Sequence, residues 1–307
     1  MQNLSEVLEK LKKQYPHLEN SQSVHTIEML KQDQDIQDFW QANQDKLAPD
    51  AFSQSLTALY EYVQQRNMAA QNSKTLYPGY VPQLDIEKGY IHVKYVPTQQ
   101  TQNKLRQKEH LNTYKMPVAI QQADLAAVVQ ESGRIDAIVE AINILDNLTH
   151  AKNYVQGLYL YGDFGVGKTY LMGALANALA ANNIDVMLLH FPSFAVDVKN
   201  SIGQKDSSTQ RLIDQAKSAT ILILDDMGAD TLSAWIRDDI LGVILEHRMQ
   251  NELTTFFTSN FSMKGLEEHL TQTRDGVEPV KAARLMQRIR FLAKPIPMSG
   301  KNRRLES

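Results

Sequence analysis

The sequence predicts an α/β protein in which a parallel sheet, covered by helices, follows a smaller and mainly helical α+β module. Three observations lead to this fold class. A glycine-rich motif of the form G-x-x-x-x-G-K-[ST] occupies residues 162–169, between an apolar segment with strand character and a run of helix formers. Apolar segments alternate with helical ones after this motif. Helical patterns rich in Gln, Asn and Asp fill most of the first 71 residues.

Composition limits the kinds of protein that this chain can be. A length of 307 residues is enough for two domains, and 43% apolar with 22% charged residues is typical of a globular protein. The net charge of −3 argues against wholesale attraction to nucleic acid, so any such contact must come from a local patch. The absence of cysteine excludes disulfides, thiolate metal sites and a cysteine nucleophile.

The sequence also indicates a compartment. No apolar run approaches the ~20 residues that span a bilayer. Residues 1–11 predict an amphipathic helix that contains acidic residues, unlike a signal peptide. We therefore expect a cytoplasmic protein that has no membrane partner.

Changes in residue composition and in secondary-structure pattern along the chain predict three segments. Residues 76–82 are turn-rich and aromatic, and residues 90–96 alternate like a half-buried strand, so a small module closes near Pro97. Residues 98–112 are polar and basic, which is typical of a linker. The predicted boundaries are 1–97 for an N-terminal domain, 98–133 for a linker and connecting helix, and 134–307 for the domain that carries the motif.

Five segments of the last part have strand character. They alternate with helical stretches, which implies a five-stranded parallel sheet with helices on both faces. Two prolines restrict the last segment to the edge of that sheet. The five segments are residues 157–161, 185–190, 220–224, 254–259 and 294–298.

The glycine-rich motif has the residue types that a phosphate site needs. Its glycines let backbone N–H groups point inward at an anion, and the N-terminus of the following helix favours negative charge. Lys168 can reach the β- and γ-phosphates, and the hydroxyl of Thr169 is placed for Mg²⁺. The motif therefore predicts a nucleoside triphosphate site with Mg²⁺, rather than a glycine-rich turn that binds nothing. The predicted binding residues are Gly162, Asp163, Phe164, Gly165, Val166, Gly167, Lys168 and Thr169.

Polar residues at two further strand ends complete the predicted site. Asp225 and Asp226 follow four apolar residues, and ligands of α/β sheets collect at such carboxyl ends. Asp225 is the predicted Mg²⁺ partner together with Thr169, and Asp226 is the residue expected to polarise the attacking water. Asn260 ends the next strand and is predicted to position water against the γ-phosphate. An acidic turn and an ordinary turn asparagine are the plainer interpretations.

The stretch of residues 281–304 contains eight basic residues and no acidic residue. Arg284 and Arg288 lie four positions apart, on one face of a helix. An arginine that completes the ATP site of a neighbouring subunit needs such a placement. A nucleic-acid patch would use the same charges, with Phe291 as a stacking ring, and a solvated helix face is the third alternative. The residues themselves leave all three open.

Taken together, the motif at residues 162–169, the two aspartates, Asn260, the basic run and the terminal Gly-Lys-Asn-Arg-Arg resemble the AAA+ helicase loaders, in particular the DnaI-type primosomal proteins related to DnaC and IstB. The resemblance implies an AAA+ ATPase that uses ATP and Mg²⁺. It makes Asp225 and Asp226 the Walker B residues, Asn260 sensor 1 and Arg288 the arginine finger, with Arg284 as second choice. Arg303 or Arg304 would be the sensor 2 arginine.

The same resemblance implies function and partners. Residues 1–97 would hold a hexameric replicative DNA helicase, and the ATPase domain would self-associate and contact single-stranded DNA, beside other primosomal proteins. The protein would deliver the helicase onto single-stranded DNA during primosome assembly in replication initiation or restart, with weak, assembly-dependent ATP hydrolysis. An IstB-like transposition helper ATPase is the alternative. A small-molecule kinase and an adaptor that binds ATP without hydrolysis are further ones.

One departure from the family concerns zinc. Its members commonly build a zinc site from cysteines in the N-terminal domain, and this chain has none. Its eight histidines are scattered without metal-ligand spacing. We therefore expect no zinc, and a module held together by packing around residues such as Tyr80, Tyr90 and Val93.

Overall fold

The computed structural model describes residues 21–71, 73–128, 131–150, 154–201 and 207–303. The helix predicted over residues 1–11 lies outside these ranges. By its contacts the chain divides into two compact units, Met1–Gln102 and Asn103–Ser307. None of the helices in the described ranges is both long enough and apolar enough to cross a membrane.

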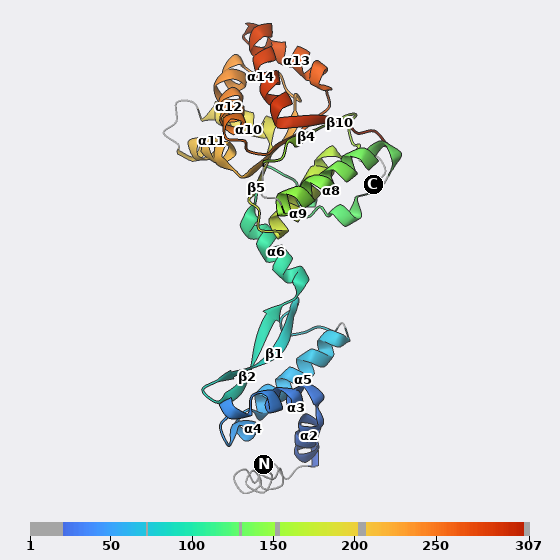
Figure 1. Cartoon of the computed structure of the whole chain (residues 1–307), viewed down its shortest axis with the longest axis vertical. Helices are drawn as coiled ribbons and strands as arrows, with labels where there is room; N and C mark the ends of the chain where they lie inside the picture. The colour runs from blue at the N-terminus through green and yellow to red at the C-terminus, as the bar shows by residue number, and fades with distance from the viewer. Residues whose placement is uncertain (1–20, 72, 129–130, 151–153, 202–206, 304–307) are drawn as a thin grey trace. The chain divides into compact units, whose positions relative to one another are not determined.

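The first unit packs helices against a β-hairpin. Its core consists of α2, α3, α5 and β2 side chains, namely Leu30, Ile36, Leu59, Tyr62, Val63 and Ile91. Its elements are α2 (Ser21–Gln32), α3 (Gln34–Ala42), the 3₁₀ turn η2 (Gln44–Lys46), α4 (Ala51–Gln54), α5 (Leu56–Ala70), β1 (Tyr80–Glu87) and β2 (Tyr90–Pro97). The two strands pair antiparallel (Figure 1).

Tyr90 is not part of this core, contrary to the prediction. Its side chain is 40% exposed, whereas Ile91 is 4% exposed. Successive side chains of a strand point to opposite faces, so burying Ile91 turns Tyr90 outward. Val93 does pack against the core, as expected.

An ion-pair cluster fastens two helices of the first unit. Arg66 of α5 contacts Asp33 at 2.6 Å, and it also pairs with Asp35. Asp33 caps α3, because its side chain accepts from the backbone N–H of Ile36. Hydrogen bonds from Arg66 and Tyr62 hold the pKa of Asp35 below its ordinary value. Within the described ranges, no group of three or more His, Cys, Asp or Glu side chains could hold a metal ion.

The second unit is built on a six-stranded parallel sheet, in the order β10-β4-β7-β6-β5-β3. All five predicted strand segments are strands, and β10 lies at an edge, as its prolines predicted. The strands are β3 (Leu111–Tyr114), β4 (Gly157–Tyr161), β5 (Val186–His190), β6 (Ile221–Met227), β7 (Thr255–Ser259) and β10 (Ala293–Pro297).

The predicted number of five strands is therefore wrong by one. The additional strand, β3, comes from residues within the predicted linker and connecting-helix range. It follows the polar helix α6 (Gln99–His110) and pairs with β5 only. An edge strand is buried less than a central one, so its four residues need no apolar run, and the sequence pattern did not reveal them.

Helices cover both faces of the sheet (Figure 1). Leu222 and Leu224 of β6 belong to one core cluster, while Ile221 and Ile223 belong to the other, because alternate residues face opposite sides. The helices are α7 (Val118–Gln121), the 3₁₀ turns η3 (Leu125–Ala127) and η4 (Ser132–Arg134), α8 (Ile135–His150), α9 (Lys168–Ala181), α10 (Phe191–Asn200), α11 (Ser207–Ser218), the π-helix η5 (Ile236–Leu241), α12 (Gly242–Gln250), α13 (Met263–Thr271) and α14 (Pro279–Leu292). A short hairpin, β8 (Gln272–Thr273) and β9 (Gly276–Val277), precedes α14.

Candidate nucleotide-binding site

The glycine-rich motif forms the loop between β4 and α9. The strand ends at Tyr161 and the helix begins at Lys168. Gly165 and Gly167 have φ angles of 75° and 98°, which residues with a Cβ atom rarely adopt. The left-handed turns, together with the unpaired N–H groups at the start of a helix, provide the geometry of an anion-binding loop.

Lys168 lies buried beside this loop, with 8% of its surface exposed. Its Nζ atom donates to the backbone oxygens of Gly162 and Asp163, at 2.8 Å each. It also donates to Oδ1 of Asn260 at 2.9 Å. An ammonium group has three donors, so phosphate oxygens would compete with these acceptors for Lys168.

The side chains of the other loop residues point to different surroundings. Val166 is 1% exposed and packs with the core of the sheet. Phe164 is 66% exposed, and Asp163 is also exposed. The backbone oxygen of Asp163 accepts a hydrogen bond from Nζ of Lys168. Their predicted binding role therefore rests on the backbone of the loop.

Asp225 is hydrogen-bonded to polar side chains on both sides, from the glycine-rich motif and from the neighbouring strand β7. It is 3% exposed, and its Oδ1 atom accepts hydrogen bonds from Oγ1 of Thr169 at 2.8 Å and from Oγ1 of Thr258 at 2.6 Å. Burial raises the pKa of Asp225 above its ordinary value, although both hydrogen bonds act in the opposite direction. A hydroxyl and a carboxylate oxygen side by side are ligands that Mg²⁺ prefers. The donor set of Thr169 and Asp225 therefore fits the predicted ion.

Asp226 connects three neighbouring strand ends. Its backbone has a φ of 62°, and its N–H donates to Oγ1 of Thr258 at 2.9 Å. Oδ1 of Asp226 accepts from Nδ2 of Asn260 at 3.4 Å. Its Oδ2 atom lies 3.9 Å from Nε2 of His190. Asn260 thus links Lys168 to Asp226, and the predicted residues of the two motifs meet at one place.

Two residues of this cluster, Thr258 and His190, were not among the predicted site residues. Thr258 joins the Asp225 side chain to the backbone of Asp226. His190 also caps α10, since its Nδ1 atom accepts from the backbone N–H of Ser193 at 3.4 Å. A signal for His190 was present in the sequence, because it ends the strand beside β6 and lies in register with Asp225.

The two candidate arginines differ in their surroundings on α14. Arg288 contacts the backbone oxygen of Gly242 at 3.0 Å and the carboxylate of Glu246 at 2.5 Å. The side chain of Arg284 is exposed and makes no hydrogen bond or ion pair with any described residue. Neither arginine contacts the phosphate loop of its own chain within the described ranges. Their predicted role in a neighbouring subunit's site stays a prediction.

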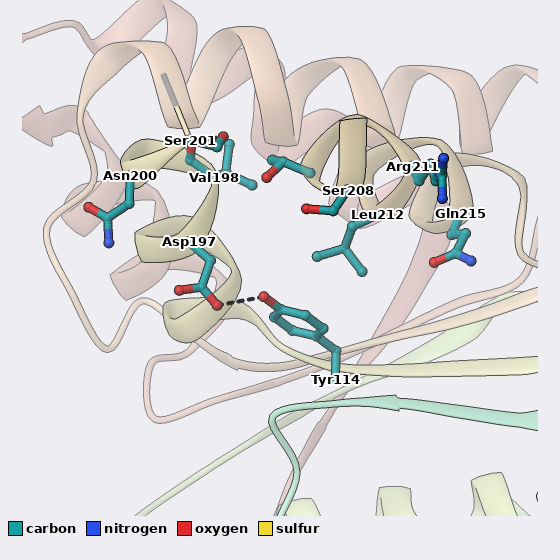
Figure 2. Close-up of a pocket in the computed structure, with 10 residues that line it drawn as sticks. Tyr114, Asp197, Val198, Asn200, Ser201, Ser208, Arg211, Leu212 and Gln215 are labelled. Atoms are coloured by element: carbon teal, nitrogen blue, oxygen red, sulfur yellow. Dashed lines mark hydrogen bonds between the residues drawn. The ribbon is translucent and has the colours of Figure 1, made fainter. Parts of the chain in front are cut away.

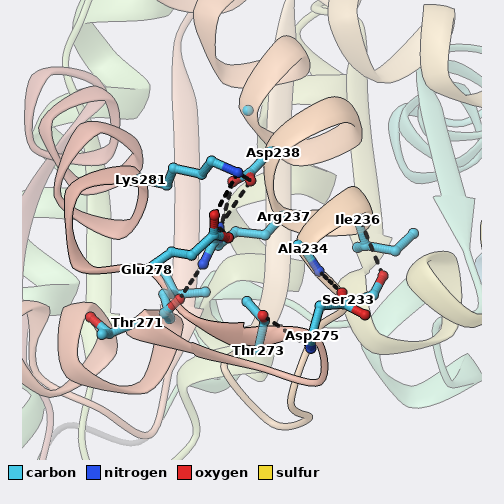
Figure 3. Close-up of polar contacts among 12 residues, drawn as sticks. Ser233, Ala234, Ile236, Arg237, Asp238, Thr271, Thr273, Asp275, Glu278 and Lys281 are labelled. Atoms are coloured by element: carbon cyan, nitrogen blue, oxygen red, sulfur yellow. Dashed lines mark hydrogen bonds and ion pairs between the residues drawn. The ribbon is translucent and has the colours of Figure 1, made fainter.

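An ion cluster around the buried side chain of Arg237 fixes the N-terminal end of α14 (Figure 3). Arg237 of η5 is 0% exposed, and its guanidinium bonds to Asp238 at 2.7 and 2.9 Å and to Glu278 at 2.6 Å. It also donates to the backbone oxygen of Leu270 at 3.0 Å. Lys281 of α14 contacts both carboxylates. The cluster ties η5, α13 and the start of α14 together, so the arginine-bearing helix has a rigid base.

Most charges of the basic run are paired inside the second unit. The partners are Asp238 and Glu278 for Lys281, Glu246 for Arg288, Glu267 for Arg290, Glu140 for Lys294 and Glu131 for Arg303. The ring of Phe291 is 46% exposed and stacks on Tyr154, with centroids 6.2 Å apart. Pairing reduces the positive potential that a nucleic-acid patch needs. Arg304, a sensor 2 candidate, lies outside the described residues.

A polar hollow lies between β3 and the helices α10 and α11 (Figure 2). Oη of Tyr114 donates to Oδ2 of Asp197 at 2.5 Å, and burial together with this hydrogen bond raises the pKa of Tyr114 to about 12. Arg211 and Gln215 line the opposite side. None of the predicted ATP-site residues lines this hollow.

Comparisons with known proteins show which family the chain belongs to. The family model "Primosomal protein DnaI N-terminus" matches residues 1–95, and the model "AFG1-like ATPase" matches residues 95–291. The replicative helicase loader DnaI of Bacillus subtilis is 36% identical over 90% of this chain and 91% of its own. The chain belongs to the DnaI family of replicative helicase loaders. Its second unit is an AAA+ P-loop ATPase domain.

Two solved structures support the fold. A crystal structure of DnaI superposes with a TM-score of 0.54 at 40% identity, over 64% of this chain and 99% of that one. A putative primosome component from Streptococcus pyogenes serotype M3 gives the same TM-score at 35% identity, over 65% of this chain and 98% of its own. The predicted AAA+ fold class is thereby confirmed, with six strands in place of five.

Proposed function

We propose that this DnaI-family chain is an ATP-dependent loader, which binds the hexameric replicative DNA helicase and delivers it onto single-stranded DNA during primosome assembly. Residues 1–97 would contact the helicase, and residues 134–307 would bind ATP. Residues 98–133 would lie between them, and their strand β3 belongs to the sheet of the second unit. The observation that carries the proposal is a match to a DnaI relative that runs through both units of the chain. The comparisons give no support to an IstB-like transposition helper.

The cluster around Lys168 supplies the chemistry for ATP binding. Backbone N–H groups of the loop and the ammonium group of Lys168 would hold the β- and γ-phosphates. Thr169 and Asp225 would hold Mg²⁺, which offsets phosphate charge when it is bound with ATP. Because Asn260 already bonds Lys168, arrival of a γ-phosphate would change the partners of both side chains.

Hydrolysis would use the neighbouring polar groups. The carboxylate of Asp226 would orient the attacking water and accept its proton, with Asn260 fixing the position of that water. Arg288 from an adjacent copy would stabilise the charge of the transferred phosphoryl group. Hydrolysis that needs a second subunit is weak in the isolated chain and depends on assembly.

The triphosphate would therefore act as a switch between arrangements of subunits. Only ATP reaches Lys168, Asp226 and a neighbour's Arg288 together, so it favours an assembly that ADP does not. Such an assembly would hold the helicase ring in a form that accepts DNA. Hydrolysis or contact with single-stranded DNA would then release the helicase in the cytoplasm, where other primosomal proteins act.

The proposal is tested by measuring the mass of complexes separated by size exclusion. The chain is mixed with its host's hexameric replicative helicase, with and without Mg²⁺-ATP, and the Lys168→Ala variant is run in parallel. We expect a stable complex whose stoichiometry or affinity changes with ATP in the wild type but not in Lys168→Ala. Absence of any complex under both conditions would overturn the loader function. Phosphate release without a phosphorylated product would exclude a small-molecule kinase. Conversion of bound ATP to ADP in a single-turnover assay would exclude an adaptor that binds ATP without hydrolysing it.

A further inference from the structure

The C-terminal segment 298–303, here called the strap, runs from the edge strand β10 along the phosphate loop. The backbone N–H of Met298 donates to the oxygen of Tyr161 at 2.7 Å, just before the loop begins. The N–H of Ser299 donates to the oxygen of Gly133 at 3.0 Å. The N–H of Arg303 donates to the oxygen of Gly165, within the loop, at 3.2 Å. One end of the strap, Met298, is thus hydrogen-bonded to the residue before the motif, and the other end, Arg303, is hydrogen-bonded to the motif itself.

Side-chain packing brings the strap and the loop into direct contact. A Cβ atom added to Gly165 would lie 1.9 Å from Oδ1 of Asn302. A Cβ atom added to Gly162 would lie 1.9 Å from the backbone oxygen of Met298. Atoms cannot approach so closely. A side chain at position 162 would therefore meet the backbone of the strap, and one at position 165 would displace the Asn302 side chain from the loop. Asn302 is half-buried in this contact.

A charged cluster holds the far end of the strap. Arg303 contacts Glu131 at 3.2 Å, and Glu131 also pairs with Arg134 at 3.4 Å. The Arg134 side chain is 3% exposed, and its guanidinium donates to the backbone oxygen of Lys301 at 3.3 Å. Arg134 is a buried residue of η4, directly before α8. The strap is therefore attached to the domain on both sides of Asn302, through Lys301 and through Arg303.

We propose that the strap sets the conformation of the phosphate loop, with Asn302 and Arg303 as positioning residues for ATP. The proposal rests on the proposed ATP-binding function. The strap bonds a carbonyl of the loop, which leaves the loop's N–H groups for phosphate. Holding Gly165 in its left-handed turn preorganises those N–H groups before ATP arrives. By reciprocal coupling, bound ATP then tightens the strap.

The first test measures ATP affinity in variants of the strap. We compare the wild type with Asn302→Ala, with Arg303→Ala and with a chain that ends at Gly300, using a fluorescent ATP analogue and Mg²⁺. Lys294→Ala is the matched control, because this β10 lysine is 58% exposed and pairs with Glu140 instead. We expect the shortened chain to bind about tenfold more weakly, each point variant about threefold more weakly, and the control unchanged. Wild-type affinity in the shortened chain would overturn the proposal.

A double-mutant cycle tests the contact itself. Gly165→Ala weakens binding for two reasons, the positive φ of 75° and the clash with Asn302. In an Asn302→Gly background only the first reason remains, so the defect of Gly165→Ala should be at least threefold smaller. Strictly additive effects would contradict the contact.

A third measurement does not depend on ATP binding. The chain has no cysteine, so Asn302→Cys introduces a unique thiol, and Lys264→Cys places one at a side chain that is 89% exposed. We expect Asn302→Cys to react with a thiol reagent at least tenfold more slowly than Lys264→Cys, without nucleotide. Equal rates would refute the strap. If the wild type fails to bind ATP while the thiol at 302 is protected, the proposed function fails and the strap geometry stands.

Discussion

The ammonium group of Lys168 donates to the side-chain oxygen of Asn260 at a distance of 2.9 Å, although 92 positions separate the two residues. The same amide donates through its nitrogen to Asp226 at 3.4 Å. Asn260 is therefore hydrogen-bonded both to the lysine predicted to bind phosphate and to the carboxylate predicted to act on water. Substitutions at these positions should separate binding from hydrolysis.

Lys168→Ala should abolish nucleotide binding. Charge-assisted hydrogen bonds contribute about 1.5–3 kcal/mol each, so losing the contacts to two phosphates should weaken binding by about 100-fold or more. Calorimetric titration with Mg²⁺-ATP measures this, with Lys294→Ala as the control. Thermal unfolding should show that the Lys168→Ala variant is folded. Binding within about threefold of the wild type would contradict the site.

Asn260→Ala should have the opposite effect, because it should preserve ATP binding and reduce hydrolysis. Its loss frees Lys168 from a competing acceptor, so ATP should bind as tightly as in the wild type or more tightly. Hydrolysis should fall by about 10–100-fold, because the water then lacks a positioning group. Rapid mixing with a fluorescent ATP analogue gives the affinity, and phosphate release gives the rate. Weaker binding with an unchanged rate per bound ATP would contradict the assignment.

Asp226→Asn should preserve binding and remove hydrolysis. The amide keeps a hydrogen-bond acceptor for Asn260 but cannot accept the proton of the attacking water, so the rate should fall by about 100-fold or more. Affinity should stay within about threefold. The measurement is a single-turnover assay, in which the variant retains ATP after separation from free nucleotide. Hydrolysis at the wild-type rate would remove Asp226 from its predicted role.

Arg288→Ala should leave ATP affinity unchanged and reduce assembly-dependent hydrolysis by about 10³-fold or to background. In this structure Arg288 is paired with Glu246, so Glu246→Gln, which releases it, should not impair hydrolysis. Phosphate release in the presence of helicase measures both. Arg290→Ala is the matched control, since this arginine is on the same helix and pairs with Glu267. If Arg284→Ala shows the defect and Arg288→Ala does not, the exposed Arg284 takes the role.

Arg66→Met should destabilise the N-terminal unit by on the order of 1–2 kcal/mol, mainly through the less exposed Asp33 contact. The pKa of Asp35 is lowered in the folded state, so its stabilising contribution is present above about pH 4 and is lost as the pH falls further. The variant should lack this part of the acid sensitivity. Urea unfolding of the full chain, followed by Trp40 fluorescence in a Trp235→Phe background, isolates the unit. Lys94→Met, an exposed substitution on β2, should leave both stability and acid sensitivity unchanged.

The sequence predicted most of the fold and most of the candidate site, because both depend on local patterns. Apolar runs that end in Asp225 or Asn260 identify central strands and the positions where ligands gather. The glycine motif identifies the loop by itself. The five strands and the meeting of Lys168, Asp225, Asp226 and Asn260 at one end of the sheet were therefore accessible before any coordinates.

The features that the sequence did not reveal depend on contacts between distant segments. β3 has no apolar run, since pairing along one side with β5 is enough to hold it. His190 is an ordinary polar residue until the register places it beside Asp225. The pairing of Arg288 with Glu246 also needs two helices to pack together. Which side of α8 is buried also depends on packing, because Ala137, Ala141 and Ile144 are buried while the apolar Ile135 and Val139 of the same helix are exposed.

Pro295 and Pro297 also determine how neighbouring copies can meet. In a parallel pair, alternate residues turn their backbone groups to opposite sides, and these prolines have no N–H to offer on the open side of β10. A second chain therefore cannot extend the sheet by strand addition at this margin. Any copy that packs against the β10 edge must do so through side chains. Such a contact can be broken and re-formed without breaking hydrogen bonds between strands.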